Sequence, residues 1–289
     1  MVTHRFQAMG TRFVFVVDAP AEAATRSFND AERVVRRLEA KLSRFRPDSE
    51  LSLLNRTGRA AVSDDLRLLT QLALDARAET GGRFDPTVGG AVIAAGYDRT
   101  FDDLPADVGC VGPAARHSGQ VEIDEATGTI ALGAQVTLDL GGIAKGYAAE
   151  MAAAVLHDAG PCLVNAGGDI ATRGVPASGS WSIGVPTPDG ELTIGLCDGA
   201  VATSGRDRRQ WHSNGRPKHH IIDPHTDQPA QSDVMRITVV AENAVAAETH
   251  ATALFMVGAD DAIDEAQALG VAAVVVTATG RTLVTGVAA

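Results

Sequence analysis

Apolar and polar residues follow two different periods along the chain, so both helices and strands are predicted. Apolar residues between 28 and 45 recur at three- and four-residue steps, which predicts an amphipathic helix of about six turns. The segment DDLRLLTQLALDARAETGG, residues 64–82, predicts a second helix, with Ser63 or Asp64 as its N-cap and Gly81 as its end. Residues 4–17 alternate and then become apolar, which predicts a first strand.

The rest of the chain mixes helices with short strands and hairpins. Residues 121–140 predict a hairpin that turns near Gly128, followed by a further strand, and 144–159 predict a helix. The remaining elements are strands on both sides of the glycines at 167–168, short strands within 180–205 and 233–241, helices near 244–258 and 259–269, and a closing hairpin over 271–286. Since the helices do not alternate strictly with the strands, the predicted class is α+β, with mixed sheets, hairpins and packed helices.

Length and composition predict a globular domain. The chain has 289 residues, 45% of them hydrophobic and 21% charged, which excludes a disordered chain and a coiled coil. No low-complexity linker divides it, so one catalytic domain over residues 1–289 is predicted, with two closely packed subdomains as the alternative. The net charge of −11 disfavours nucleic acid as a partner, and it requires that any bound polyphosphate be neutralised locally.

The cysteines and the apolar runs indicate neither a disulfide framework nor a membrane anchor. Cys110, Cys162 and Cys197 lie far apart and form no CxxC pair, so buried free thiols are expected. The apolar run FVFVV near the N-terminus has the length of a strand, and no signal peptide or lipobox is visible. A cytoplasmic protein is therefore expected.

Two glycine-rich turns could carry chemistry. In TLDLGGIAKGYAAE, Asp139 precedes two glycines and Lys145 follows them, and VNAGGDI places Asp169 after another glycine pair. Glycine lets the backbone approach a ligand, and a helix N-terminus attracts phosphate. The same patterns also suit plain structural turns, so a strand-to-helix turn, a tight hairpin and one shared ligand site remain open.

The segment AAETHATALFMVG and a histidine-rich loop add further candidates. Glu248 and Thr252 are one helical turn apart, so a carboxylate and a hydroxyl share a face and could bind a hard cation such as Mg²⁺. A surface glutamate beside a threonine bonded to its own helix is the alternative. The histidines of HSNGRPKHHIIDPHTD lack a zinc pattern, whereas one of them could act as a general base.

Taken in order, eight segments resemble the ApbE family of FAD:protein FMN transferases, also called flavin transferases. The segments are AMGTRF, LSRFRPDSELSLLN, GGRFDPTVGG, LDLGGIAKGYAAE, LVNAGGDI, VATSGRDRRQW, HHIIDPHTDQPA and ETHATALFMVG. The resemblance implies an ApbE-like fold and an enzyme that binds FAD and Mg²⁺. Such an enzyme transfers FMN to a threonine hydroxyl of an acceptor flavoprotein and releases AMP, a post-translational flavinylation.

The resemblance also implies roles for individual residues. FAD contacts are implied for Met9, Phe45, Arg83, Phe84, Asp85, Asp139, Lys145 and Ile222. Metal ligands are implied at Gly142, through its carbonyl, and at Glu248 and Thr252. His220 is the first candidate for the base that accepts the threonine proton, and Asp169 is the second.

Three positions depart from the usual family pattern. The family normally has aspartate at position 248, so the longer Glu248 could shift the ion or favour Mn²⁺ or Ca²⁺. Phe45 stands where tyrosine is common, so stacking is kept without a hydroxyl. Asp227 stands where glycine is common, and aspartate tolerates positive φ better than most residues. Two other functions therefore stay open: an FAD pyrophosphatase that yields FMN and AMP, and a non-catalytic FAD-binding protein.

Overall fold

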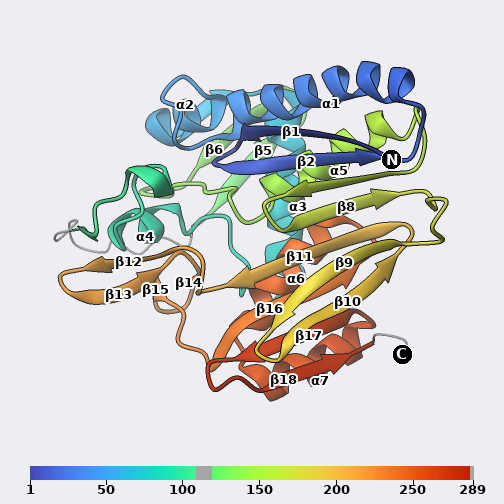
Figure 1. Cartoon of the computed structure of the whole chain (residues 1–289). Helices are drawn as coiled ribbons and strands as arrows, with labels where there is room; N and C mark the ends of the chain where they lie inside the picture. Colours follow the sequence, from blue (N-terminus) through green and yellow to red (C-terminus); the bar gives the residue numbers. More distant parts are fainter. Residues whose placement is uncertain (109–118, 287–289) are drawn as a thin grey trace. The chain divides into compact units, whose positions relative to one another are not determined.

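The structure is a computed structural model that describes residues 1–108 and 119–286, and Cys110 lies outside them. The chain divides into two compact units (Figure 1). The first unit comprises Met1–Arg37, Lys145–Gly205 and Ser232–Ala289, and the second comprises Leu38–Ala144 and Arg206–Gln231. A single catalytic domain over residues 1–289 stays a prediction.

The first unit is built on one antiparallel sheet. Its strands follow the order β1-β2-β7-β8-β11-β16-β17-β18, and every neighbouring pair is antiparallel. Their bounds are β1 Val2–Ala8, β2 Thr11–Val17, β7 Cys162–Ala166, β8 Asp169–Arg173, β11 Gly199–Gly205, β16 Val234–Ala241, β17 Ala272–Thr277 and β18 Thr282–Thr285.

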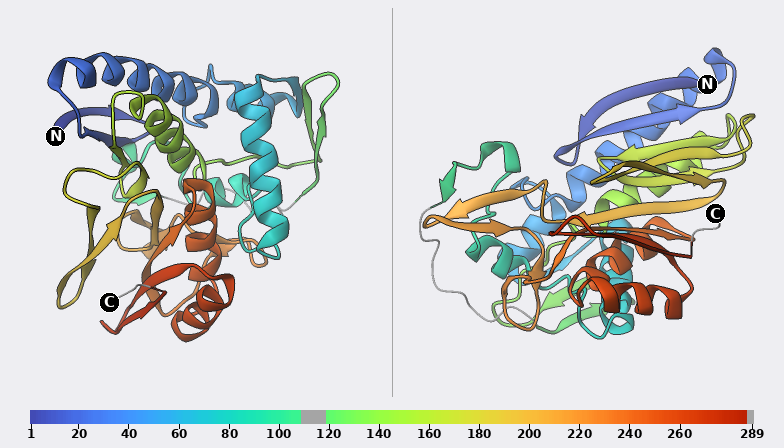
Figure 2. Two further views of the ribbon diagram at one scale, coloured as in Figure 1. Left: turned by 90° about the vertical axis from the view of Figure 1, so that its right-hand side faces the viewer. Right: turned by 60° about the horizontal axis from the view of Figure 1, so that its bottom comes forward.

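The two faces of this sheet are covered differently. The hairpin of β9 (Trp181–Thr187) and β10 (Gly190–Leu196) packs on one face, where Ile183 contacts Ile170 and Val201 (Figure 1). Helix α6 (Ala244–Phe255) packs on the other face, where its Ala244 and Ala247 contact Ala200 and Ala202 of β11. Along β11, Val201 therefore points to the hairpin, and its two neighbours point to the helix. This alternation is the period of two expected of a strand that is buried on both sides. Helices α1 (Ala21–Leu42, to Arg37), α5 (Ala144–Leu156, from Lys145) and α7 (Ala259–Leu269) complete the unit (Figure 2).

The predicted first strand over 4–17 is wrong, because this segment forms the β1–β2 hairpin. Met9 and Gly10 make its two-residue turn with φ of 52° and 66°. Two positive φ values are what a tight antiparallel hairpin requires. Methionine is not a residue that normally signals such a turn, so the sequence pattern concealed it.

The second unit consists of short elements around an aromatic core. Tyr97, Trp211 and Ile222 are buried in one cluster, and the indole N–H of Trp211 donates to the carbonyl of Ala95 at 2.8 Å. The elements are α2 Glu50–Thr57, β3 Arg59–Ala61, α3 Asp64–Glu79, α4 Gly89–Ala94, a 3₁₀ turn at Phe101–Asp103, β4 Asp107–Val108, β5 Val121–Asp124, β6 Thr129–Leu132, β12 Gln210–Ser213, β13 Arg216–His219, β14 Ile222–Asp223 and β15 Gln228–Pro229.

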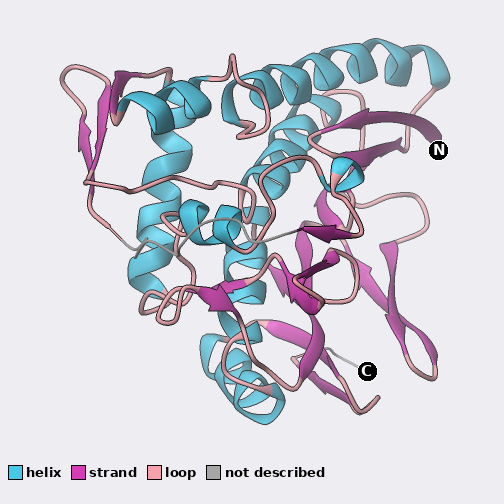
Figure 3. Ribbon diagram, turned by 90° about the vertical axis from the view of Figure 1, so that its left-hand side faces the viewer, coloured by secondary structure: helices cyan, strands magenta, loops and turns pink. Residues whose placement is uncertain are grey.

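Two further elements of the second unit differ from the sequence pattern. Helix α2 was not predicted, although Ser49 caps its N-terminus and Gly58 ends it with a φ of 71°. The strand predicted at the end of 121–140 is wrong, because only an isolated bridge between Val88 and Thr137 forms there. The mixture of sheets, hairpins and packed helices confirms the α+β class (Figure 3).

Candidate active site

Three charged side chains meet in the interior of the first unit. Lys145 lies in the first turn of α5, Asp169 begins β8, and Glu248 lies in α6. The Lys145 ammonium is 2.5 Å from Asp169 Oδ2 and 2.7 Å from Glu248 Oε1. Their side chains are 16%, 9% and 5% exposed, so all three are largely withdrawn from water. We call these residues the buried triad.

The backbone around the buried triad is shaped by glycines. Glu248 Oε2 accepts a hydrogen bond from the amide of Gly146 at 3.0 Å, one of the unpaired donors that a helix N-terminus provides. A Cβ on Gly146 would lie only 2.7 Å from that oxygen. Gly167 and Gly168 have φ of 75° and 117°, and they turn the chain so that Asp169 follows at once. The glycines of both motifs therefore position the acids of the buried triad: Gly146 positions Glu248, and Gly167 and Gly168 position Asp169.

The charges of the buried triad do not balance. One ammonium faces two carboxylates, which leaves one negative charge when all three are ionised. Burial raises the pKa of Glu248 to about 8; Lys145 opposes this shift, and Asp169 adds to it. Because an isolated buried charge is costly, such a cluster favours uptake of a cation or a proton.

The predicted metal ligands of α6 share one face, as their spacing requires. Thr252 follows Glu248 by one turn, and its hydroxyl is 3.1 Å from that of Ser204 on β11. Among the described residues no group of three histidine, cysteine or acidic side chains is placed to hold a metal. The donors available here are carboxylate and hydroxyl oxygens with surplus negative charge, and this set suits a hard cation.

In the second unit, Asp139 is held by partners on both oxygens. Its Oδ1 accepts from the amide of Gly141 at 2.8 Å, and its Oδ2 is 3.0 Å from Arg44 Nε. The amide of Asp139 donates to the carbonyl of Pro86 at 2.8 Å, which joins it to the loop 83–88 between α3 and α4. The ring of Phe84 in that loop lies against Gly142, whose missing Cβ would be 3.2 Å away.

Asp85 of the same loop is almost completely buried. Its side chain is 1% exposed and lies 3.1 Å from Arg77 Nε of α3. Its other oxygen accepts from the amide and the hydroxyl of Thr87 at 2.8 and 2.6 Å. Arg83, at the start of the loop, is held as well: its Nε donates to the carbonyl of Thr80 at 3.1 Å. These contacts fix the conformation of the loop through hydrogen bonds and an ion pair within the second unit.

The remaining predicted residues lie in three places. Phe45 and Ile222 pack in the aromatic core of the second unit, so the structure brings these two together. His220 lies between β13 and β14 and is half-buried. Met9 lies in the β1–β2 turn of the first unit. Asp227 has a φ of 54°, which confirms that its position requires a left-handed backbone.

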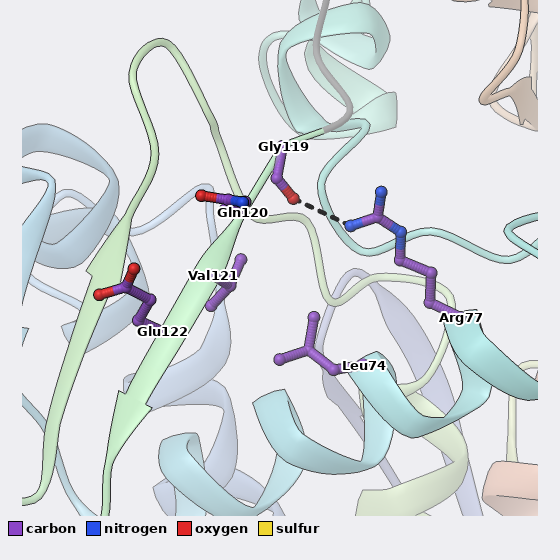
Figure 4. Close-up of a pocket in the computed structure, with 6 residues that line it drawn as sticks. All are labelled: Leu74, Arg77, Gly119, Gln120, Val121 and Glu122. Carbon is purple, nitrogen blue, oxygen red and sulfur yellow. Dashed lines mark hydrogen bonds between the residues drawn. The ribbon is translucent and has the colours of Figure 1, made fainter.

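A cavity of about 560 Å³ lies elsewhere in the second unit (Figure 4). It is lined by Leu74, Arg77, Gly119, Gln120, Val121 and Glu122. Arg77 also donates to the carbonyl of Gly119 at 2.9 Å. None of the predicted site residues lines this cavity, so it is not the predicted FAD site.

Arg44 and Arg77, which pair with the carboxylates of Asp139 and Asp85, were not among the residues predicted from the sequence. They stand among 25 lysines and arginines, and neither has a local spacing that marks it. The only available signal was the presence of acids at 85 and 139, each of which needs a partner when it is buried.

Comparison with known proteins assigns the chain to a family. The model of the ApbE family matches residues 9–275. A Haemophilus influenzae FAD:protein FMN transferase is 30% identical over 96% of this chain and 87% of its own length. The Treponema pallidum FAD:protein FMN transferase is 31% identical over 83% of this chain and 73% of its own length.

Solved structures agree. The crystal structure of an ApbE protein from Thermotoga maritima superposes with a TM-score of 0.86 at 28% identity, covering 98% of this chain and 96% of its own. A flavin transferase ApbE from Vibrio cholerae gives 0.81 at 25% identity, with 99% and 97% covered. The fold and the sequence are thus those of a transferase enzyme, as predicted. The chain belongs to the ApbE family. Among the described residues, no helix combines the length and the hydropathy needed to cross a membrane.

Proposed function

We propose that this chain carries out Mg²⁺-dependent transfer of FMN from FAD to a threonine hydroxyl of an acceptor flavoprotein and releases AMP. Family membership supports the reaction, because the relatives from H. influenzae and T. pallidum are FAD:protein FMN transferases. The observation that carries the proposal to this chain is the buried triad, whose second carboxylate is not balanced by the single lysine.

A hard divalent cation fits the residues of this region. Glu248 and Thr252 offer carboxylate and hydroxyl oxygens from one face of α6, and the resemblance adds the carbonyl of Gly142. When bound, the ion neutralises the negative charge that develops on the departing AMP. Glu248, Thr252 and the Gly142 carbonyl would hold it, and Mn²⁺ or Ca²⁺ are the alternatives because Glu248 is longer than aspartate.

The reaction requires one bond to form and one to break. The threonine oxygen bonds to the FMN-side phosphorus, and the bridging oxygen leaves with AMP, so the enzyme must mainly position groups and stabilise charge. The hydroxyl proton passes to a base. His220 is our first candidate for that base, because Asp169 is already engaged by a hydrogen bond from the Lys145 ammonium. Lys145 supplies positive charge beside the two acids.

The FAD contacts remain part of the proposal. In the second unit these are Phe45, Arg83, Phe84, Asp85, Asp139 and Ile222, and in the first unit they are Met9 and Lys145. Asp85 is enclosed by Arg77 and Thr87, so we propose that it acts by shaping its loop rather than by touching FAD through its carboxylate. A cytoplasmic location also stays a prediction.

The decisive experiment incubates the purified protein with FAD, Mg²⁺ and an acceptor flavoprotein that carries the target threonine. Covalent flavin on the acceptor and an equal amount of AMP are expected, and an acceptor with threonine replaced by valine is the control. Free FMN released without any acceptor would indicate the pyrophosphatase. FAD binding with neither AMP nor covalent flavin, in Mg²⁺ or in Mn²⁺, would leave only the FAD-binding protein.

A further inference from the structure

Arg44 connects several predicted contact residues of the second unit, although no sequence pattern singled it out. It lies between α1 and α2, and its side chain is only 9% exposed. Its Nε lies 3.0 Å from Asp139 Oδ2, and its Nη1 donates to the carbonyl of Tyr97 at 2.8 Å. The guanidinium therefore joins two segments that are far apart in the sequence.

The same guanidinium also rests on two aromatic rings. Its central carbon is 4.1 Å from the centroid of Phe45 and 4.7 Å from that of Tyr97. Those centroids are 5.6 Å apart and the rings are tilted by 49°, and the guanidinium lies over both rings. Because the group is planar and weakly hydrated, it can stack on rings and donate hydrogen bonds in its own plane together.

Asp139 keeps acceptor capacity in this arrangement. Each carboxylate oxygen has two lone pairs, and one contact is made by each: Gly141 on Oδ1 and Arg44 on Oδ2. Thus the carboxylate can still accept an N–H or O–H of a ligand while its rotamer is fixed from two sides. Without Arg44, a carboxylate that is 14% exposed would lose its only positive partner among the described residues.

We infer that Arg44 is a positioning residue for FAD binding, acting through the Asp139 carboxylate and the Phe45 ring. The inference rests on the proposed function, in which both of these residues contact FAD. Arg44 fixes where the carboxylate accepts and where the ring offers its face. FAD that binds to the protein finds both groups already ordered, so the entropy of ordering them is not lost at binding.

The test compares Arg44→Met, Arg44→Lys, Asp139→Asn and the double variant Arg44→Met/Asp139→Asn by flavin fluorescence titration with FAD. Arg46→Met is the matched control, since Arg46 is two residues away and its ion pair with Asp48 is exposed. Thermal unfolding of each variant measures any loss of folding separately. Steady-state AMP release with the acceptor gives KM for FAD and kcat.

Arg44→Met is expected to raise the FAD Kd and KM about tenfold or more, with kcat at saturating FAD within about threefold of wild type. Arg44→Lys keeps the charge but not the planar fork, so its Kd should be intermediate. If Arg44 acts through Asp139, the double variant binds only about as weakly as Asp139→Asn, because the two losses are not additive. Arg46→Met should bind within about twofold of wild type.

Two results would overturn the inference. One is FAD affinity of folded Arg44→Met and Arg44→Lys equal to wild type, even if both melt at lower temperature, since that is a purely structural role. The other is full additivity of the losses in FAD affinity caused by Arg44→Met and Asp139→Asn, since independent losses mean that Arg44 does not act through Asp139. Wild-type protein that binds no FAD would instead refute the proposed function itself, so the two failures are distinguishable.

Discussion

The two units balance the charge of their buried and half-buried acids differently. In the first unit, Asp169 and Glu248 share the single ammonium of Lys145. In the second unit, Asp85 and Asp139 each have an arginine, Arg77 and Arg44 respectively (3.1 and 3.0 Å). A neutral pair is suited to holding a fixed conformation, whereas an excess of negative charge is suited to receiving a cation. Under the proposed function, the difference indicates that the first unit supplies the acidic metal ligand.

The strongest test of this comparison removes the surplus acid. Glu248→Ala is expected to lower metal-dependent AMP release about a hundredfold or more, since a lost ligand removes charge stabilisation worth several kcal/mol. Thr252→Ala should impair turnover in the same direction. Glu242→Ala, an exposed glutamate just before α6, is the control and should keep wild-type activity. Full activity of both Glu248→Ala and Thr252→Ala would show that the metal site is wrongly assigned.

A smaller effect is expected where the charges balance. Arg77→Met leaves the carboxylate of Asp85 buried without its cation, and breaking such a pair costs about 3 kcal/mol of unfolding free energy. Chemical denaturation would measure this loss. Arg33→Met removes an exposed pair with Asp30 and is the matched control. If Arg77→Met proved as stable as the control, the pairing with Asp85 would not be what holds the loop.

The pH dependence of stability sharpens the comparison further. Burial raises the folded-state pKa of Glu248 from 4.5 to about 8, so between these values the folded protein binds a proton that the unfolded chain does not. The metal-free protein should therefore lose stability as pH rises through this window. Glu248→Gln removes this titrating carboxyl, so the unfolding free energy of the variant should depend less on pH between about 4.5 and 8. Equal slopes for the two proteins in thermal unfolding from pH 5 to 8 would contradict the charge imbalance.

The smallest effect on stability is expected at Asp227, an acid of the second unit that has no arginine partner among the described residues. Asp227 has positive φ, and its Oδ1 is buried without a hydrogen-bond partner among the residues that the structure describes. Asp227→Gly should preserve or raise the unfolding free energy by up to about 1 kcal/mol, because it relieves both costs. Asp227→Val should lower it, since a branched side chain resists this backbone. A marked loss in the glycine variant would show that the carboxylate has a stabilising role.

Local patterns predicted most helices and strands, because apolar spacing is fixed by the period of each element. Helix α1 and the hairpin of β17 and β18 follow this rule. The spacing also placed Glu248 and Thr252 on one face of α6. The prediction of a single strand over 4–17 was wrong because Met9 has a positive φ in the β1–β2 turn, where glycine or asparagine is usual.

The assembly of the site was less accessible from sequence. Lys145 and Glu248 are 103 positions apart, and no local spacing predicts that their side chains touch. The resemblance to a family named both residues without giving their contact. Arg44 and Arg77 were invisible for the same reason, since their roles come from tertiary neighbours rather than from any motif.

The bare backbone at Gly146 has a consequence for redesign. A Cβ there would lie 2.7 Å from Glu248 Oε2 and 3.1 Å from the Cβ of Ala244, so alanine would require the end of the Glu248 side chain to shift. Position 146 therefore limits the room for the acid at position 248. An attempt to exchange the ion by shortening residue 248 should vary both positions together.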